Sequence, residues 1–97
     1  MNVELSDRAH REMQRIDMAW RKQADFPEVF LDELFETVKI IETTGVLGTP
    51  YQVKAKRRVT RFLMEKSSYH VYLVRQSEDL VVVVSIWSAR RRRGPKL

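Results

Sequence analysis

Hydrophobic positions change their spacing partway along the chain. Between Ala9 and Trp20, apolar side chains recur every three or four residues, which is the spacing of one helical face. Ser6 is a residue type that caps helix N-termini, and Asp7 places a negative charge in the first turn, where the helix dipole favours it. The pattern predicts a helix over residues 7–23. Its apolar stripe consists of Ala9, Met13, Ile16 and Trp20.

A second helix is predicted over residues 26–44. Asp25 and Glu28 have the spacing of a capping box, and Gly45 stands where a glycine commonly ends a helix. The link of Ala24 and Asp25 is so short that we expect an antiparallel helical hairpin. The predicted stripe is Phe30, Leu34, Val38 and Ile41, supported by Leu31, Phe35 and Ile40, and the predicted outer face carries Asp32, Glu33, Glu36 and Glu42.

In the C-terminal half of the chain, apolar residues recur with a period of two residues, which indicates β-strands. Residues 45–52, rich in Gly, Thr and Pro, are predicted to be a loop. The near-continuous apolar run from Leu80 indicates a central strand covered on both faces, and the alternation of Val3 and Leu5 indicates a short edge strand over residues 2–5. Strands are predicted at 57–65, 69–75 and 80–87, with turns at 66–68 and 76–79.

These elements predict an α+β fold in a single domain covering residues 1–97. In it, an N-terminal helical hairpin, with the short first strand, packs on a C-terminal antiparallel β-meander. Two helices can cover only one face of such a sheet, so the opposite face is expected to be partly open. Residues 88–97 form a basic tail.

Charge is divided unevenly between the two halves. Residues 1–44 carry six Lys/Arg and ten Asp/Glu, a net −4, whereas residues 45–97 carry twelve and three, a net +9. A basic surface of this strength attracts nucleic acid or an acidic protein. The alternative is a solvated basic face that only aids solubility.

Composition narrows the classes of function. The chain has no cysteine, which favours a reducing cytosol, and residues 1–13 lack the apolar core of a signal peptide. The longest apolar run, Leu80–Val84, is too short to span a membrane, so we expect a cytoplasmic protein. Three glycines form no nucleotide-binding loop and two histidines form no metal motif, so neither a metal nor a cofactor is expected.

Basic side chains form the candidate anion-binding site. One group leads into and along the first meander strand and the other follows the last strand, and we expect both to meet at one end of the sheet, with His70 and Tyr72 between them. Such a site could bind a phosphodiester, and could cleave RNA without metal, because His serves as acid or base and Arg stabilises a phosphorane. The two groups are Lys54, Lys56, Arg57, Arg58 and Arg61, and Arg90, Arg91, Arg92 and Arg93.

Each of these residues also has a simpler interpretation. Lys54–Arg58 would then be a solvated edge, and the arginine run would be a disordered tail. Tyr69 or Tyr72 would then pack in the core, and His70 would support the fold without taking part in chemistry, because aromatic side chains on strands more often have such roles.

The chain resembles the RelE/ParE superfamily of type II toxin–antitoxin toxins over nearly its whole length. The resemblance rests on the order and spacing of several segments. They are Val3-Glu4-Leu5-Ser6 with Ala9, Phe30 and Leu34, residues 57–64 (RRVTRFLM), residues 68–72 (SYHVY) and the ParE-type end at residues 85–97 (SIWSARRRRGPKL).

The resemblance implies two alternative activities. RelE-type members are ribosome-dependent mRNA endonucleases that use a Lys/Arg cluster and a C-terminal tyrosine, whereas ParE-type members poison DNA gyrase. Here Arg61 and Arg90 match the nuclease set. No tyrosine follows Tyr72, Leu63 stands at a lysine position, and His70 stands at an arginine position.

The resemblance therefore implies a ParE-like toxin that inhibits gyrase and is neutralised by a cognate antitoxin in a hetero-oligomer. A disordered amphipathic antitoxin segment rich in Glu and Asp would suit the basic sheet. The residues expected to bind the target are Lys54, Lys56, Arg58, Arg61, Arg90 and Arg91.

Two alternatives remain open. One is an mRNA endonuclease acting on the ribosome through Lys56, Arg61, His70 and Arg90. The other is a non-toxic DNA- or RNA-binding module with the same fold.

Overall fold

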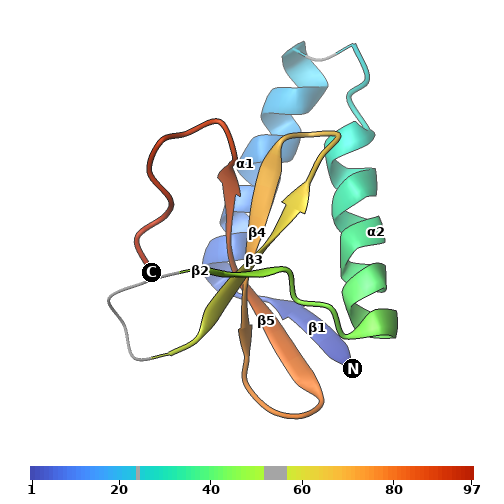
Figure 1. Ribbon diagram of the computed structural model, residues 1–97. Helices are drawn as coiled ribbons and strands as arrows, with labels where there is room; N and C mark the ends of the chain where they lie inside the picture. The colour runs from blue at the N-terminus through green and yellow to red at the C-terminus, as the bar shows by residue number, and fades with distance from the viewer. Residues whose placement is uncertain (24, 52–56) are drawn as a thin grey trace.

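The computed structural model describes residues 1–23, 25–51 and 57–97, and within them a helical hairpin packs on one face of a twisted sheet (Figure 1). The α+β architecture predicted from the sequence is thus confirmed. The elements in chain order are β1 (Asn2–Leu5), α1 (Asp7–Gln23), α2 (Val29–Thr44), β2 (Thr49–Tyr51), β3 (Val59–Met64), β4 (Tyr69–Arg75) and β5 (Leu80–Ser88).

The sheet has the strand order β1-β5-β4-β3-β2. The predicted meander of β3, β4 and β5 is confirmed, with antiparallel pairing on both sides of β4. Strand β1 lies at one edge of the sheet, as predicted. It pairs parallel to β5, with Val3 opposite Val81. Strand β5 carries one extra residue, Val84, because Leu73 pairs with Val83 and Tyr72 with Ser85. This β-bulge lies at the middle of the face that carries the candidate site.

The predicted loop over residues 45–52 is wrong at residues 49–51. These form β2, which pairs with β3 and places Thr49 opposite Arg61. Gly48 makes the pairing possible, since its φ is +83° and a Cβ there would collide with the backbone carbonyl of Arg61. Three residues are too few for a period-two signal, so the strand could not be recognised from the pattern.

Helix α1 has its predicted bounds, and the Ser6 hydroxyl accepts a hydrogen bond from the Ala9 amide at 3.1 Å. Helix α2 begins at Val29, three residues later than predicted. Its N-cap is Glu28, which makes no side-chain cap bond, so the predicted capping box does not form. Gly45 ends α2 in the left-handed conformation, with φ +72°, as predicted.

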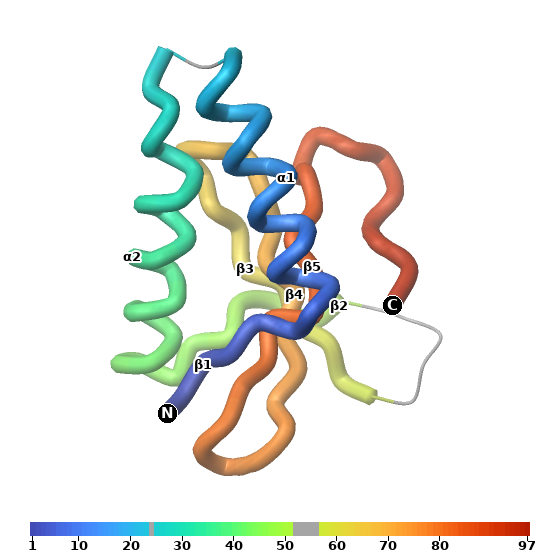
Figure 2. Tube along the Cα trace, turned by 180° about the vertical axis from the view of Figure 1, so that it is seen from behind, coloured from blue at the N-terminus to red at the C-terminus, as the bar shows by residue number. Residues whose placement is uncertain are grey.

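The main core is formed by side chains of the two helices and of the sheet. The view from behind shows the helical hairpin in front of the strands (Figure 2). The core contains the predicted stripe of α1 and the α2 residues Phe30, Leu34 and Ile41. Two supporting positions of α2 were predicted wrongly, because Phe35 is 59% exposed and Ile40 is 44% exposed. Glu33, assigned to the outer face, is buried. Its carboxylate accepts hydrogen bonds from the amides of Lys66 and Ser67, both at 2.8 Å. The amides of the β3–β4 turn therefore hold the Glu33 carboxylate in its buried position.

A second apolar cluster lies on the opposite face of the sheet. Its buried members are Val59, Tyr72 and Val74, and the last residue of the chain, Leu97, packs against them. The tail is held there because the Trp87 indole donates a hydrogen bond to the Arg93 carbonyl at 2.7 Å and the Arg8 side chain donates one to the Lys96 carbonyl. The tail is thus folded against the sheet face that was predicted to be partly open.

Candidate functional site

The two basic groups of the sequence lie at opposite ends of the sheet. Met64 pairs with Tyr69, and Tyr69 pairs with Ser88, so the end of β3 meets the end of β5. The start of β3, with Arg57 and Arg58, is therefore at the other end. The expected meeting of the two groups was wrong, because the outer strands of an antiparallel meander run parallel to each other. Lys54 and Lys56 lie outside the described residues.

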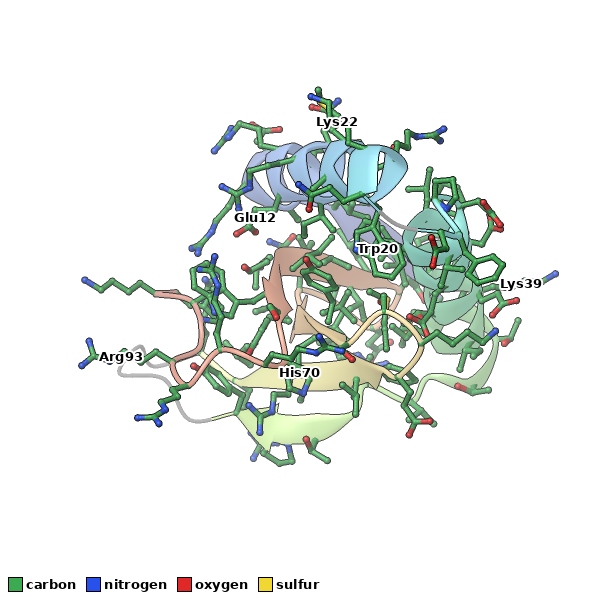
Figure 3. All side chains as sticks on the ribbon, turned by 90° about the horizontal axis from the view of Figure 1, so that it is seen from above. Glu12, Trp20, Lys22, Lys39, His70 and Arg93 are labelled. Atoms are coloured by element: carbon green, nitrogen blue, oxygen red, sulfur yellow. The ribbon has the colours of Figure 1, made fainter. Side chains whose placement is uncertain are left out.

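Arg61 lies at the centre of the face opposite the helices. It pairs with Tyr72 across β3 and β4, and its guanidinium carbon is 5.5 Å from the centre of the Tyr51 ring. Tyr51 packs edge-on against Tyr72, with ring centres 4.8 Å apart, and His70 lies 6.0 Å from Tyr72. We call Tyr51, Arg61, His70 and Tyr72 the central cluster. Figure 3 shows His70 on the side of the sheet away from α1.

The tail brings part of the arginine run to the same face. The Arg91 guanidinium stacks over the Trp87 ring at 4.6 Å, and Trp87 pairs with His70 across β4 and β5. Arg91 thereby extends the central cluster toward the end of β5. Arg90 is exposed, with its backbone amide bonded to the Ser88 hydroxyl at 3.3 Å, and Arg93 points away from the body of the protein (Figure 3). Among the predicted tail arginines, Arg91 places its side chain against this face, whereas Arg93 reaches it through its backbone carbonyl.

Burial shifts the pKa values of two members of the central cluster, His70 and Tyr72. It lowers the pKa of His70 below its ordinary value of 6.5, and the nearby charge of Arg61 lowers it further. Burial also raises the pKa of Tyr72 above 10.0, with Arg61 opposing part of that shift. At neutral pH the site therefore presents a neutral imidazole, a neutral phenol and a permanent guanidinium charge. Such a group can attract an anion with Arg61, and its imidazole can accept a proton.

The basic surface extends beyond the predicted residues onto the first helix. Helix α1 carries five Lys/Arg against three Asp/Glu, whereas residues 25–44 carry one against six. The acidic charge of the N-terminal half is thus concentrated in residues 25–44, which include α2. Arg15 of α1 and Arg91 line a hollow of about 240 Å³ together with Tyr69 and Trp87. Counting charge separately for each predicted helix would have found this basic helix, whereas dividing the chain into halves concealed it.

Tyr51 is the member of the central cluster that sequence reasoning missed. It lies in the unrecognised strand β2, and no pattern marked it as a strand residue. Among the described residues, no group of three His, Asp or Glu side chains is placed to hold a metal ion. In the same part of the chain, neither helix is long and apolar enough to cross a membrane.

Comparison with solved structures relates this fold to that of a known protein. The chain is similar to a chain of the structure described as "Chromosomal ParDE TA system from P. aeruginosa", with a TM-score of 0.76 and 13% sequence identity. The match covers 93% of this chain and 97% of that chain. No protein-family model matches the sequence, and no curated protein matches it. The likeness is one of fold, and it agrees with the ParE-like resemblance of the sequence.

Proposed function

We propose that this protein is the toxin of a type II toxin–antitoxin pair, and that it inhibits DNA gyrase as ParE-type toxins do. The observation that carries the proposal is the fold shared, over 93% of the chain, with a chain of a ParDE toxin–antitoxin system. The ParE-like order of segments in the sequence supports the same assignment independently of the structure.

The central cluster supports a docking surface more than a nuclease site. Tyr72 is only 1% exposed and lies against Tyr51, so its phenol is not open to a substrate. Leu63, at 45% exposure, presents an apolar side chain where RelE-type nucleases carry a lysine. A surface of stacked aromatic rings and arginines is typical of protein–protein contacts, in which these residue types are enriched.

Neutralisation would use the same basic surface. The face formed by Arg61, Arg91 and the tail carries many positive charges, and the exposed Phe35 and Ile40 lie on the outside of α2. An acidic, amphipathic antitoxin segment could satisfy both, because it would bring carboxylates to the arginines and apolar side chains to the helix. The functional unit in the cell would then be a toxin–antitoxin hetero-oligomer.

A supercoiling assay with purified toxin and gyrase tests this function. Addition of the protein should reduce supercoiling or trap cleaved DNA, and prior mixing with the antitoxin should abolish the effect. A charge-reversed Arg61→Glu variant, checked for folding by circular dichroism, serves as the inactive control. Unchanged supercoiling at saturating wild-type protein would contradict the proposal.

A second candidate function is cleavage of translated mRNA on the ribosome. The observation that favours it is the neutral imidazole of His70 beside Arg61, which could accept a proton while the guanidinium stabilises a phosphorane. Primer extension after induction would then reveal new 5′ ends, and a His70→Gln variant would lose them. If no new ends are seen while growth stops, this alternative is excluded.

A further inference from the structure

We infer that the sheet surface under the tail binds an extended, acidic segment of a partner protein, and that residues 93–97 of this chain occupy it as a competing ligand. We call this surface the tail site. Its side chains are Arg8, Tyr51, Val59, Tyr72, Val74 and Trp87. The inference goes beyond the proposed function, since it holds whether or not gyrase is the target.

Two side chains of the tail site recognise main-chain atoms of the tail. The Trp87 indole donates a hydrogen bond to the Arg93 carbonyl at 2.7 Å, and the Arg8 guanidinium donates one to the Lys96 carbonyl. Every peptide has carbonyls with this spacing. These two hydrogen bonds are therefore open to an extended segment of any sequence that fits the rest of the site.

The other contacts select residues by size and polarity. The tail leaves the end of β5 and turns back until Gly94 lies against the Tyr51 hydroxyl, where a Cβ would overlap it (Figure 1). The next residue, Pro95, is buried, and Leu97 packs against the second apolar cluster. The tail site thus fits a glycine, then a proline, and an aliphatic side chain two positions later.

Contacts outside the tail hold the side chains of the tail site in place. Arg8 forms an ion pair with Glu12 at 3.7 Å, within the same helix. Tyr51 packs edge-on against Tyr72, with ring centres 4.8 Å apart, and Trp87 belongs to β5. The site is therefore preorganised, which lowers the entropy that a bound segment must overcome.

The tail itself is held by few contacts. Within the described part of the chain, no backbone–backbone hydrogen bond involves residues 92–97, and the two carbonyl contacts above come from side chains. Segments with so few hydrogen bonds open at a much smaller free-energy cost than global unfolding. Another segment can therefore replace the tail while the sheet stays folded.

The tail has the wrong charge for the surface it covers. Residues 90–97 carry five Lys/Arg and no acid. They lie against a surface that carries Arg8 and, next to Tyr51, the Arg61 guanidinium. The Glu12 carboxylate beside Arg8 is already bonded to the Ser85 hydroxyl through its other oxygen. An acidic segment of the same shape would replace repulsion by attraction, so charge complementarity favours an acidic partner over the tail.

Nuclear magnetic resonance with capped five-residue peptides tests the tail site. Gly94→Ala, checked for folding by circular dichroism, should release its own tail and shift the Trp87 indole N–H signal, because the hydrogen bond to Arg93 is lost. The acidic peptide EGPEL should then return this signal toward its wild-type position in a saturable way. Absence of saturable binding to Gly94→Ala would overturn the inference.

Peptide variants test the stated chemistry of the partner. The peptide RGPKL, which repeats residues 93–97, should bind Gly94→Ala at least about threefold more weakly than EGPEL at low salt, and added salt should reduce the difference. The peptide EAPEL should bind at least about tenfold more weakly, because its extra methyl group meets the Tyr51 hydroxyl. Equal binding of all three peptides would show that the site reads neither charge nor glycine.

Two arginine variants of Gly94→Ala separate a direct contact from net charge. Arg8→Gln should weaken binding of EGPEL at least about fivefold, because a charge-assisted donor is removed. Arg11→Gln, which removes the same charge from an exposed position of α1, is the matched control and should bind EGPEL nearly as Gly94→Ala does. Equal losses in the two variants would reduce the effect to general attraction and overturn the inference.

The wild-type protein tests competition by the tail. EGPEL should bind it at least about tenfold more weakly than it binds Gly94→Ala, because the attached tail has a high effective concentration at the site. Equal affinity for both proteins would show that the tail is no competitor. Displacement of the tail by an oligonucleotide of eight uridines, but not by EGPEL, would assign the surface to nucleic acid and would also overturn the inference.

Discussion

The Glu12 carboxylate accepts a hydrogen bond from the Ser85 hydroxyl at 2.9 Å, joining α1 to β5 across 73 positions of sequence. The same Oε1 atom also accepts the Ile86 amide at 3.1 Å. Both groups are buried, and Figure 3 shows Glu12 between the helix and the sheet. This carboxylate satisfies an amide of β5 beyond the point where β1 stops pairing with it.

Replacing Glu12 with Ala should therefore be strongly destabilising. It leaves the Ser85 hydroxyl and the Ile86 amide without a partner, and we expect a loss of about 2–4 kcal/mol in the free energy of unfolding. Urea denaturation measures it. Glu36→Ala is the control, since the exposed pair of Glu36 with Lys66, at 3.8 Å, should contribute less than about 1 kcal/mol. Equal losses in the two variants would show that the buried contacts do not support β5.

Gly48 and Gly45 offer a matched pair of glycine substitutions. Both have positive φ, so Ala at either position is strained by about 1 kcal/mol. At Gly45 a Cβ would meet nothing within 4 Å, whereas at Gly48 it would collide with the Arg61 carbonyl. We expect Gly48→Ala to cost about 3 kcal/mol and to detach β2, as amide hydrogen exchange at Tyr51 would report. A similar cost for both variants would contradict the close approach of β2 to β3.

Gly94 controls the docking of the tail. A Cβ at this position would overlap the Tyr51 hydroxyl, so Gly94→Ala should release the tail from the second cluster. Trypsin should then cleave at Arg90–Arg93 roughly tenfold faster than in the wild type, because opening of the segment limits cleavage. Lys96→Ala, which alters an exposed tail side chain, is the control and should be cleaved after these arginines at the wild-type rate. An unchanged rate for Gly94→Ala would mean that the tail does not depend on this contact.

His70 should make stability depend on pH. Its pKa in the folded protein lies below the ordinary 6.5, so the unfolded chain binds the proton more tightly. The stability that neutral His70 contributes is present above pH 6.5 and is lost as the pH falls through and below that value. When the pH is lowered from 7.5 to 5, the midpoint temperature of thermal unfolding should fall less in the His70→Gln variant than in the His10→Gln variant. A resonance of His70 that titrates at or above pH 6.5 would contradict the assignment.

Charge reversal tests which basic surface the protein needs for its toxicity. Arg61→Glu changes the central cluster and Arg90→Glu the exposed tail, and each should relieve growth arrest more than Arg21→Glu. Arg21 lies on α1 in a surface ion pair with Asp17 at 3.0 Å, which contributes little to stability. Colony counts after induction, corrected for the amount of folded protein, measure the effect. Equal relief by all three variants would show that the sheet and tail are not the active surface.

Much of the fold could be predicted because amphipathic spacing is a local property. The helical stripe of α1, the alternation in β3 and β4 and the apolar β5 each follow from the face that the element buries. Glu12 and Glu33 are exceptions, since their burial depends on amides that come from distant strands and turns. Strand β2 escaped prediction for a similar reason: its three residues become a strand only through pairing with β3.

The sequence by itself determined the two secondary-structure classes, their order, and the residue types available for binding anions, because these depend on spacing and composition along the chain. Only the tertiary structure decided which of those residues meet. Strand direction separated Arg58 from the end of β5, and the returning tail placed Arg91 on Trp87. Such meetings depend on the path of the whole chain through space, so a local pattern of residues cannot specify them.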